Sequence, residues 1–576
     1  MNIEPDFGTM HAELDAALEL LNRNKQQWAQ TPVVERLAIL ARIRDGVNQV
    51  AQNWAETAAR KKGLDANAPL AGEEWISGPY ALMTYCNALM ETLSKVAGKA
   101  YLNGLPMREL PSGQLAVKVM PHSIWDHLLL SGVSAEVWME PGITRANLAQ
   151  HTAHGYDASQ PASGKLALVL GAGNIAAIAP LDCLQKLFVN NDVVLLKMNP
   201  VNDYLTPFLE AALAPLIASG FLRIVSGDAT VGQYLCNHKL VETIHITGSA
   251  AAHDAIVWGT GSEAAANRTA GTPKNKRPIT SELGGVSPTI VVPGPWTKAD
   301  LAFQAENVAT QKLHNAGFNC IACQVLVLPA NWKQKTAFLK AVEASLSSSA
   351  PRPLYYPGAA ARLAEFQNGI TGPAVAQPAT ASQCGVFPFT AGTNRTAERF
   401  EVFAPALAVT ELPGDDAEAF LISAIDYANR SLAGTLGANI LIHPQTLRQI
   451  GQRRFDEIIT KLRYGTIAIN AWTGLGFLLP QATWGAFPGH TLDDVQSGIG
   501  VVHNTLLFDR PQRTVVEAPF APFPRNLLSL SFTLLPRPPW FITNRRASVL
   551  GRLLTRFAYR PSLAKLVRIF ANALVG

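Results

Sequence analysis

The chain of 576 residues is too long for a single hydrophobic core, and its hydrophobic content of 48% is enough to fill two or three domains. Six cysteines spread over this length exclude a disulfide scaffold and are typical of a reducing interior. The first residues contain no apolar segment with a small-residue cleavage site, so we expect no secretory signal. No apolar run approaches the roughly 18 residues that span a bilayer.

The net charge of +5 is unevenly distributed along the chain. No acidic residue follows Glu517, whereas nine lysine and arginine residues do, which leaves about −4 for the preceding part. The pattern predicts a mildly acidic globular body with a basic C-terminal extension.

The N-terminal region, residues 10–97, predicts helices. Apolar residues recur at three- and four-residue spacing between Val34 and Val47, which is typical of an amphipathic packing layer. Residues 101–160 mix short apolar runs with glycine and proline, and predict irregular strands and loops.

From Gly164 the pattern changes to alternating strands and helices. We expect strands at 166–170, 193–196, 222–225 and 241–247, with helices at 181–189 and 205–218. Short apolar strands separated by helices imply a parallel sheet covered on both faces, as in a dinucleotide-binding domain. Residues 258–277, rich in Gly, Ala, Asn and Thr, predict an inserted surface loop.

A second alternating region predicts strands at 289–292, 325–328, 439–442 and 466–469, with a helix at 299–315. It contains Cys320 in the stretch N-A-G-F-N-C-I-A, and the stretch S-E-L-G-G-V-S-P around Glu282 lies upstream. A thiol with a pKa of about 8.5 is only a few per cent thiolate at neutral pH, so a cysteine that attacks carbonyls needs a base. The two stretches resemble the ELGGKSP and NxGQxCxA motifs of the aldehyde dehydrogenase superfamily. The resemblance implies that Cys320 is the nucleophile and Glu282 the general base.

The stretch G-A-G-N-I-A-A at 171–177 follows a predicted strand and opens a helix, as does the G-x-G-x-x-A of a Rossmann fold. That fingerprint needs an acid about twenty residues on, but here the second strand ends in Lys197. The arrangement resembles the cofactor domain of the superfamily, although Gly173 replaces the tryptophan of its PWN motif. The resemblance implies that Asn174 holds the oxyanion and Lys197 contacts the adenosine ribose. An ordinary Rossmann loop is the alternative.

Two further motifs point to cofactor binding. Gly248 and Ser249 lie between a predicted strand and a helix, where backbone N–H groups favour a pyrophosphate; an ordinary helix start is the alternative. The stretch E-V-F-A-P at 401–405 resembles the EIFGPV motif of the superfamily. It implies that Glu401 holds the nicotinamide ribose and Phe403 backs the ring. Without its neighbours, Glu401 would read as a surface carboxylate.

Two departures concern the nucleophile itself. Cys320 and Cys323 form a C-x-x-C, but neither a thioredoxin-like start nor a matching second pair accompanies it, so we expect no redox pair and no metal site. Phe318 stands where the superfamily usually has glutamine.

The basic extension predicts two amphipathic helices, at 549–557 and from 562 onward. Residues 524–576 therefore suit an anionic membrane surface. Packing on the chain's own body or on a partner subunit is the alternative, and no motif supports a nucleic-acid partner.

The resemblance runs from about residue 26 to residue 504 and implies an α/β fold of two parallel-sheet domains with a small bridging or oligomerisation segment. We divide the chain into N-terminal helices and cofactor domain (1–280), catalytic domain (281–480), return and bridging segment (481–517) and extension (518–576). We expect a homodimer or homotetramer in the cytoplasm, peripheral at the inner face of a membrane if the extension binds one.

The implied activity is oxidation of an aldehyde, expected to be hydrophobic, to a carboxylic acid through a thiohemiacetal and a thioester. NAD is the expected cofactor. NADP should be tolerated, because Met198, Asn199 and Pro200 follow Lys197 and no carboxylate stands there to repel a 2′-phosphate. The alternatives are an acyl-thioester (fatty acyl) reductase on the same fold and a catalytically silent membrane-associated scaffold.

Overall fold

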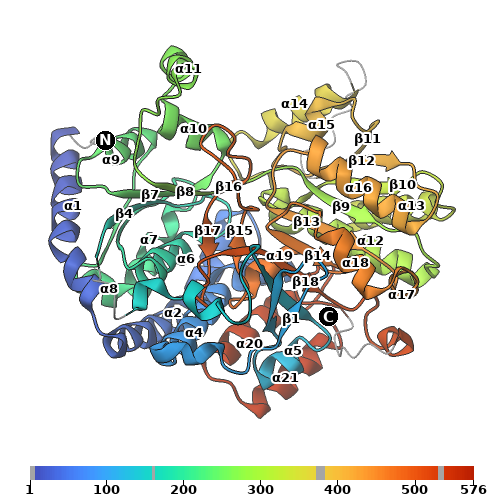
Figure 1. The fold of residues 1–576 in the computed structure, drawn as a ribbon, viewed down its shortest axis with the longest axis horizontal. Coiled ribbons are helices and arrows are strands. Elements are labelled where there is room, and N and C mark those ends of the chain that lie inside the picture. Colours follow the sequence, from blue (N-terminus) through green and yellow to red (C-terminus); the bar gives the residue numbers. More distant parts are fainter. Residues whose placement is uncertain (1–6, 158–162, 372–382, 530–536) are drawn as a thin grey trace.

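Two open sheets divide the molecule into halves that lie side by side (Figure 1). The computed structural model describes residues 7–157, 163–371, 383–529 and 537–576. Helices cover the sheets, so the predicted α/β fold class is confirmed.

The first half is built on a six-stranded sheet in the order β16-β8-β7-β4-β5-β6. All neighbours are parallel except β16, which runs antiparallel to β8. The predicted strands are present because short apolar runs are buried on both faces of the sheet. The strands are β4 (Leu166–Leu170), β5 (Val193–Lys197), β6 (Leu222–Val225), β7 (Thr243–Gly248), β8 (Ile279–Leu283) and β16 (Gly498–Ile499).

Helices from the N-terminal region pack against this half, as the spacing of apolar residues predicts. Ile39, Leu40, Ile43 and Val47 are buried, whereas Val34, at the start of its helix, is 71% exposed. The N-terminal helices are α1 (Phe7–Gln30), α2 (Val33–Lys61), α3 (Gly72–Trp75) and α4 (Ala81–Ser94). The helices between the strands of this half are α6 (Ile178–Leu184), α7 (Thr206–Ala212), α8 (Ala214–Ala218), α9 (Ala229–Asn237) and α10 (Ala250–Trp258).

The prediction of a surface loop at 258–277 is wrong in part, because this segment contains the helix α11 (Gly261–Ala270). Its alanine-rich sequence favours a helix. Gly271 ends it in the left-handed conformation, with φ of 62°, which is typical of a helix C-terminus. No residue of α11 is buried, and the helix projects from the top of the molecule (Figure 1).

The second half is built on a ten-stranded sheet in the order β1-β2-β3-β18-β14-β13-β9-β10-β12-β11. The strands from β18 to β11 are parallel, and β1, β2 and β3 are antiparallel. The strands are β1 (Met107–Glu109), β2 (Leu115–Met120), β3 (Ser134–Met139), β9 (Ser287–Val291), β10 (Cys323–Pro329), β11 (Gly385–Pro388), β12 (Ala406–Leu412), β13 (Gly437–Leu441), β14 (Thr466–Ile469) and β18 (Pro511–Glu517).

The region expected to be irregular therefore supplies three strands and the capped helix α5 (Ile124–Leu129). The strands β15 (Trp484–Gly485) and β17 (Val501–His503) form a separate pair. Side chains of β10 alternate between two cores: Val325 and Val327 enter one, Leu326 and Leu328 the other. The helices of this half are α12 (Lys298–Leu313), α13 (Lys335–Ser348), α14 (Ala359–Thr371), α15 (Arg395–Arg399), α16 (Ala417–Ser431), α17 (Pro444–Ile450), α18 (Gln452–Ile459) and α19 (Thr473–Leu478).

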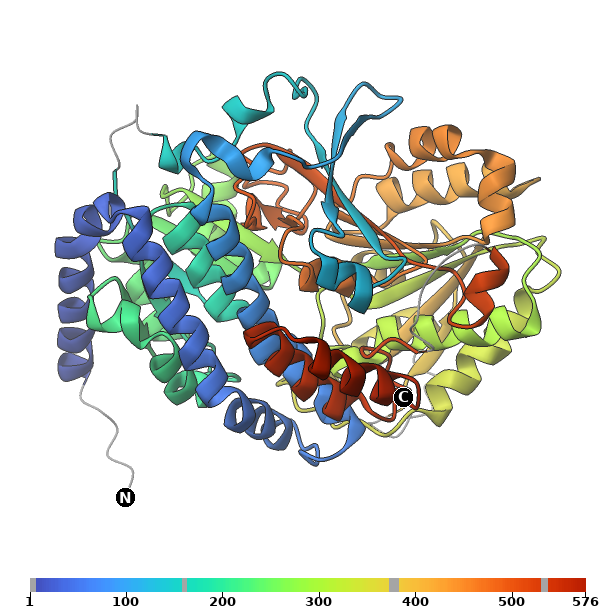
Figure 2. The same ribbon diagram turned by 90° about the horizontal axis from the view of Figure 1, so that it is seen from below.

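The C-terminal extension forms the two predicted helices, α20 (Ala547–Tyr559) and α21 (Leu563–Ala573). They run beneath the molecule between the N-terminal helices and the second half (Figure 2). The apolar face of α20 is buried, and a Cβ on Gly72 of α3 would lie 2.4 Å from the carbonyl carbon of Ala547. The alternatives for the extension are a membrane surface and packing on the chain's own body or on a partner subunit. The helix α20 packs on the chain's own body.

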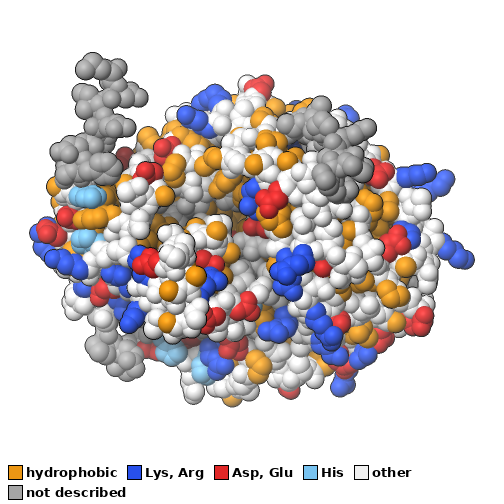
Figure 3. Space-filling model, turned by 90° about the horizontal axis from the view of Figure 1, so that it is seen from above, with side chains coloured by type: hydrophobic (Ala, Val, Ile, Leu, Met, Phe, Trp, Pro, Cys, Tyr) orange, Lys and Arg blue, Asp and Glu red, His pale blue; other side chains and the backbone are white. Residues whose placement is uncertain are grey.

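The outer face of α21 is different, because Leu563 and Val567 are 70% and 69% exposed. Residues 530–536 of the proposed membrane-binding extension lie outside the described residues. Within the described ranges, no helix has the length and hydropathy that crossing a bilayer requires. On the upper face of the body, basic side chains lie among acidic and apolar ones (Figure 3).

Candidate functional site

The predicted nucleophile and base meet where the two sheets adjoin. Glu282 lies near the end of β8, the last parallel strand of the six-stranded sheet, and Cys320 lies just before β10 of the other sheet. The chain crosses between the sheets through Gly284 and Gly285, where a Cβ on Gly285 would lie 2.9 Å from the Ala433 carbonyl oxygen. The Cys320 Sγ–H donates to Glu282 Oε1 at 3.1 Å.

The turn before Cys320 is left-handed over three successive residues. Asn315, Ala316 and Gly317 have φ of 53°, 56° and 79°. The first two carry a side chain, so each costs free energy that the surroundings must offset. One support is Glu73, whose Oε2 accepts the Asn315 backbone N–H at 2.8 Å.

A second support is a buried lysine that the sequence analysis missed. Lys62 Nζ donates to Glu74 Oε1 at 2.9 Å, to Asn315 Oδ1 at 3.0 Å and to the Asn174 carbonyl oxygen at 3.1 Å. The side chains of Lys62 and Glu74 are only 4% and 1% exposed, and buried charges of this kind need partners. The N-terminal layer thus connects the nucleophile turn to the Asn174 turn. The adjacent acids Glu73 and Glu74 were the only hint in the sequence.

Asn174 is buried, and its Nδ2 donates to the Phe318 carbonyl oxygen at 3.1 Å. A primary amide has two N–H groups, so one further donor is available beside Cys320. The Phe318 side chain is buried against Tyr355, Tyr356 and Phe403, at ring-centroid distances of 5.0, 5.6 and 5.8 Å. This aromatic cluster explains why phenylalanine fits where the superfamily usually has glutamine.

The site raises the pKa of both reacting groups. Burial is the largest cause for the Cys320 thiol, and the neighbouring Glu282 carboxylate adds to it. Burial also raises the pKa of Glu282, with a further contribution from Asp182 that His503 partly offsets. The proton therefore rests on the thiol, within hydrogen-bond reach of the carboxylate that can accept it.

A buried acid and two histidines lie behind Glu282, and sequence analysis missed all three. Thr247 Oγ1 donates to Asp182 Oδ2 at 2.9 Å, and the Nε2 atoms of His245 and His503 lie 3.4 and 3.5 Å from the carboxylate. Burial alone would raise the pKa of Asp182, but the imidazoles outweigh it and bring that pKa to about 2. A helix and two distant strands contribute these residues, so no local signal joins them.

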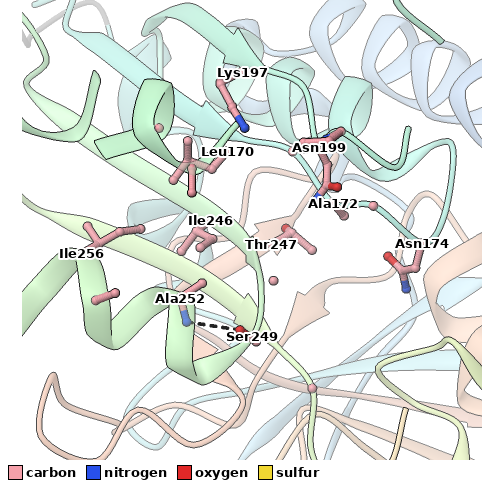
Figure 4. A pocket seen from close by; sticks show the side chains of 18 of the residues that line it. Leu170, Ala172, Asn174, Lys197, Asn199, Ile246, Thr247, Ser249, Ala252 and Ile256 are labelled. Atoms are coloured by element: carbon pink, nitrogen blue, oxygen red, sulfur yellow. Dashed lines mark hydrogen bonds between the residues drawn. The ribbon is translucent and has the colours of Figure 1, made fainter. Parts of the chain in front are cut away.

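One cavity of about 720 Å³, the large cavity, receives every residue predicted for the site. Figure 4 shows Asn174, Lys197 and Ser249 on different elements around this space. The predicted residues that line it are Asn174, Lys197, Gly248, Ser249, Glu282, Cys320, Glu401 and Phe403.

The lining of the large cavity suits a dinucleotide. Glu401 Oε1 is buried without a hydrogen-bond partner among the described residues, and a Cβ on Gly284 would come within 1.8 Å of it. Burial, opposed by Arg362, raises the pKa of Glu401 to about 7. Ser249 Oγ accepts the Ala252 N–H at 3.1 Å and caps α10, so a helix N-terminus faces this space. A ribose hydroxyl and a pyrophosphate would satisfy these groups.

Asp228 is an acid that sequence analysis missed in the same cavity. It caps α9 by accepting the Thr230 and Val231 N–H groups at 2.9 and 3.2 Å. Burial lowers the pKa of Lys197, and the charge of Asp228 opposes that effect. Asp228, from another loop, thus places an acid near Lys197. The residues that follow Lys197 in the sequence supply none.

A second, apolar cavity of about 30 Å³ lies against Cys320 and Glu282. Its walls come from α19, β15, the N-terminal layer, the start of α6 and the turn that carries Cys320. They include Ile76, Ile178, Ile321, Trp472, Phe477 and Trp484. Cys323 is fully buried in β10, and no cluster of metal-ligating side chains occurs within the described residues.

Comparison with known sequences finds the Aldehyde dehydrogenase family profile over residues 183–351. Coniferyl aldehyde dehydrogenase of Pseudomonas sp. is 34% identical over 172 residues, which are 29% of this chain and 28% of that protein. Geranial dehydrogenase of Castellaniella defragrans is 27% identical over 282 residues, 46% of this chain and 52% of that protein. The matches thus span from about a quarter to about half the length of these relatives.

Comparison with solved structures covers nearly the whole chain. A mutant of aldehyde dehydrogenase C from Pseudomonas syringae, in complex with NAD+ and octanal, has a TM-score of 0.59 at 18% identity, covering 89% of this chain and 90% of that one. Gamma-glutamyl-gamma-aminobutyraldehyde dehydrogenase from Burkholderia cenocepacia has a TM-score of 0.58 at 18% identity, covering 88% of each chain. These neighbours establish the fold. The sequence profile over residues 183–351 and the curated relatives add a similarity to the aldehyde dehydrogenase family in the sequence itself.

Proposed function

We propose that the protein oxidises an aldehyde to a carboxylic acid with NAD(P). The observation that carries this proposal is the 3.1 Å contact between Cys320 Sγ and Glu282 Oε1, where a cavity of dinucleotide size meets a small apolar one. The family profile and the relatives named for aldehyde oxidation support it.

In the first step, Glu282 takes the Cys320 proton as the sulfur bonds to the aldehyde carbon. The carbonyl oxygen becomes an oxyanion, for which the free Asn174 N–H and the Cys320 backbone N–H are the proposed donors. One donor of this kind contributes about 10²–10³ in rate. The strained turn of residues 315–317 holds the sulfur in position for this attack.

NAD, when bound, supplies the acceptor for the hydride that turns the adduct into a thioester. Lys197, Gly248, Ser249, Glu401 and Phe403 are the residues proposed to hold it. Their placement around one cavity and the unpartnered Glu401 Oε1 support this assignment.

Before the last step, the first proton passes from Glu282 to solvent. Glu282 then takes a proton from water, which attacks the thioester and releases the acid, and it returns this proton to the departing thiolate to restore the free thiol. Its raised pKa makes the carboxylate a stronger base than an exposed glutamate. An acyl-thioester reductase is less well supported, since a hydrolytic base in contact with the thiol would waste the acyl group. A silent scaffold would not need this pair.

The substrate class, assembly and location are further proposals. Apolar walls around Cys320 favour a hydrophobic aldehyde. A homodimer or homotetramer stays a prediction. So does contact with an anionic membrane from the cytoplasmic side, for which the exposed apolar face of α21 offers a surface.

The test is NADH or NADPH formation by the full chain with a panel of aldehydes. Cys320→Ala should abolish oxidation while cofactor binding, followed by fluorescence, is retained. Cys323→Ala is the matched control and should stay active, because this buried thiol lies outside the large cavity. Equal loss in both variants, or oxidation that survives without Cys320, would refute the proposal.

A further inference from the structure

The C-terminal extension packs close to the apolar cavity beside Cys320. Trp540, from the segment before α20, packs on the cluster of buried apolar residues that also contacts Cys320. That cluster consists of Ile321, Leu436, Trp472, Trp484 and Val502. The extension therefore reaches the same wall that surrounds the nucleophile.

Trp540 lines two small cavities that neighbour the apolar one. An outer cavity of about 40 Å³ is lined by Trp540 and Trp472, and another of about 10 Å³ by Trp540, Ile76 and His314. Trp472, Ile76 and His314 are walls of the inner cavity as well. Two small cavities thus flank the indole, and each shares a wall with the inner cavity, so Trp540 lies behind Trp472, Ile76 and His314 on the way outward from Cys320.

The segment that carries Trp540 is firmly attached to α12. The Ile542 N–H donates to Thr310 Oγ1 at 3.2 Å, and Arg537 Nε and Thr543 Oγ1 donate to Glu306 Oε2 at 3.1 and 3.0 Å. The rings of Phe541 and Phe303 stack at 5.3 Å. These contacts lie on both sides of Trp540, so the indole is held against the wall.

We propose that Trp540 is a specificity-determining residue that limits the length of the aldehyde. This inference rests on the proposed function. A space of about 30 Å³ holds one or two water-sized groups, so a compact apolar aldehyde fits, and a longer chain must push the shared walls outward against the indole. Removal of the indole joins the two neighbouring cavities and gives Ile76 and Trp472 room to move away from Cys320.

The experiment compares propanal, hexanal and decanal with the full-length wild type, Trp540→Ala and Trp540→Phe. Wild type should prefer propanal. Trp540→Ala should raise the ratio of kcat/KM for decanal to that for propanal by about tenfold or more, since each methylene placed in an apolar pocket is worth a factor of this order. Trp540→Phe should fall between them, and it also serves if the alanine variant unfolds.

Trp125→Ala is the matched control. Trp125 packs edge-on against Phe557 of the extension, at 5.4 Å, and lines none of these three cavities. It should leave the chain-length ratio unchanged. An equal shift in this variant would mean that any loosening of the extension suffices, and would overturn the role of Trp540.

A second readout does not depend on turnover. Labelling of Cys320 by short and long N-alkyl maleimides, followed by mass spectrometry, should show the same gain for long chains in Trp540→Ala. If wild type oxidises no aldehyde, the proposed function fails, while the labelling still tests access. If wild type prefers decanal, or neither readout changes in the folded variants, the inference about Trp540 is wrong.

Discussion

The two cavities that meet at Cys320 are built in different ways. The large cavity is lined mainly by turns at the ends of parallel strands, with residues such as Asn174, Lys197 and Ser249. The apolar cavity is lined by side chains from α19, β15, the N-terminal layer, the start of α6 and the nucleophile turn, and Trp540 of the extension packs on the cluster around it. Its volume is about 30 Å³, against about 720 Å³.

This difference shows how one reaction centre can combine a side built from short motifs at strand ends with a side built from the packing of remote segments. Carboxyl ends of parallel strands lie along one edge of a sheet, so short motifs after successive strands meet there. The apolar walls depend on how remote segments pack, and they vary with each insertion or extension. We therefore expect mutations on the two sides to have separable effects.

The largest expected effect is at the junction itself. Glu282→Gln should lower kcat by about 10²–10⁴, because both proton transfers lose their base. Rapid-mix measurement of NADH would show a burst followed by slow turnover if thioester hydrolysis is the step most affected. If the NADH burst slows as much as the later turnover, Glu282 acts mainly in thiol activation. Near-normal turnover would contradict the assignment of Glu282 as the base at the point where the two cavities meet.

The next largest effect is expected at the buried Lys62 network, which supports the turns of Asn174 and Cys320. Lys62→Met leaves Glu74 buried without its cation and should cost about 3–5 kcal/mol of unfolding free energy. The double variant with Glu74→Gln should recover much of that loss. Lys25→Met, which breaks the half-buried pair with Glu242, should cost only about 0–1 kcal/mol. Denaturant unfolding of the four proteins tests this, and equal losses for both lysines would contradict a special role for the buried network.

A change confined to the large cavity should alter cofactor choice alone. Asp228→Asn keeps an N-cap residue on α9 but removes the charge near Lys197, so kcat/KM for NADP should rise about tenfold relative to NAD. The chain-length ratio for aldehydes should not move. An unchanged cofactor ratio would show that Asp228 does not face the 2′ position of the adenosine ribose. NADP should then be tolerated, as the residues after Lys197 predict.

The smallest expected effect is a shift in pH dependence. Glu282 acts as a base when ionised, so activity should fall as the pH drops through its raised pKa. Burial is the main cause of that raised pKa, and Asp182 adds to it. Asp182→Asn should therefore move the acid limb of the kcat/KM profile to lower pH. A shift to higher pH would mean that the imidazoles His245 and His503 dominate the field at Glu282.

Much of the fold could be predicted because its signals are local. The strands at 222–225 and 466–469 have the predicted bounds, since each is a short apolar run between breaking residues. The helix α11 was missed because glycine, asparagine and threonine obscured the helix-forming alanines. The β-strands between 107 and 139 were underestimated, because their pairing partner β18 lies far along the chain.

The sequence by itself determined the reaction centre: a cysteine and a glutamate in glycine-containing turns, and the motifs whose residues line the large cavity. These features are local, because strand ends and turns depend on neighbouring residues. Only the tertiary structure decided that Lys62 supports the nucleophile turn, that Asp228 joins Lys197 and that Trp540 packs on the cluster around Cys320. Those contacts join segments remote in sequence, and their free energy comes from burial and charge pairing that no short stretch of residues encodes.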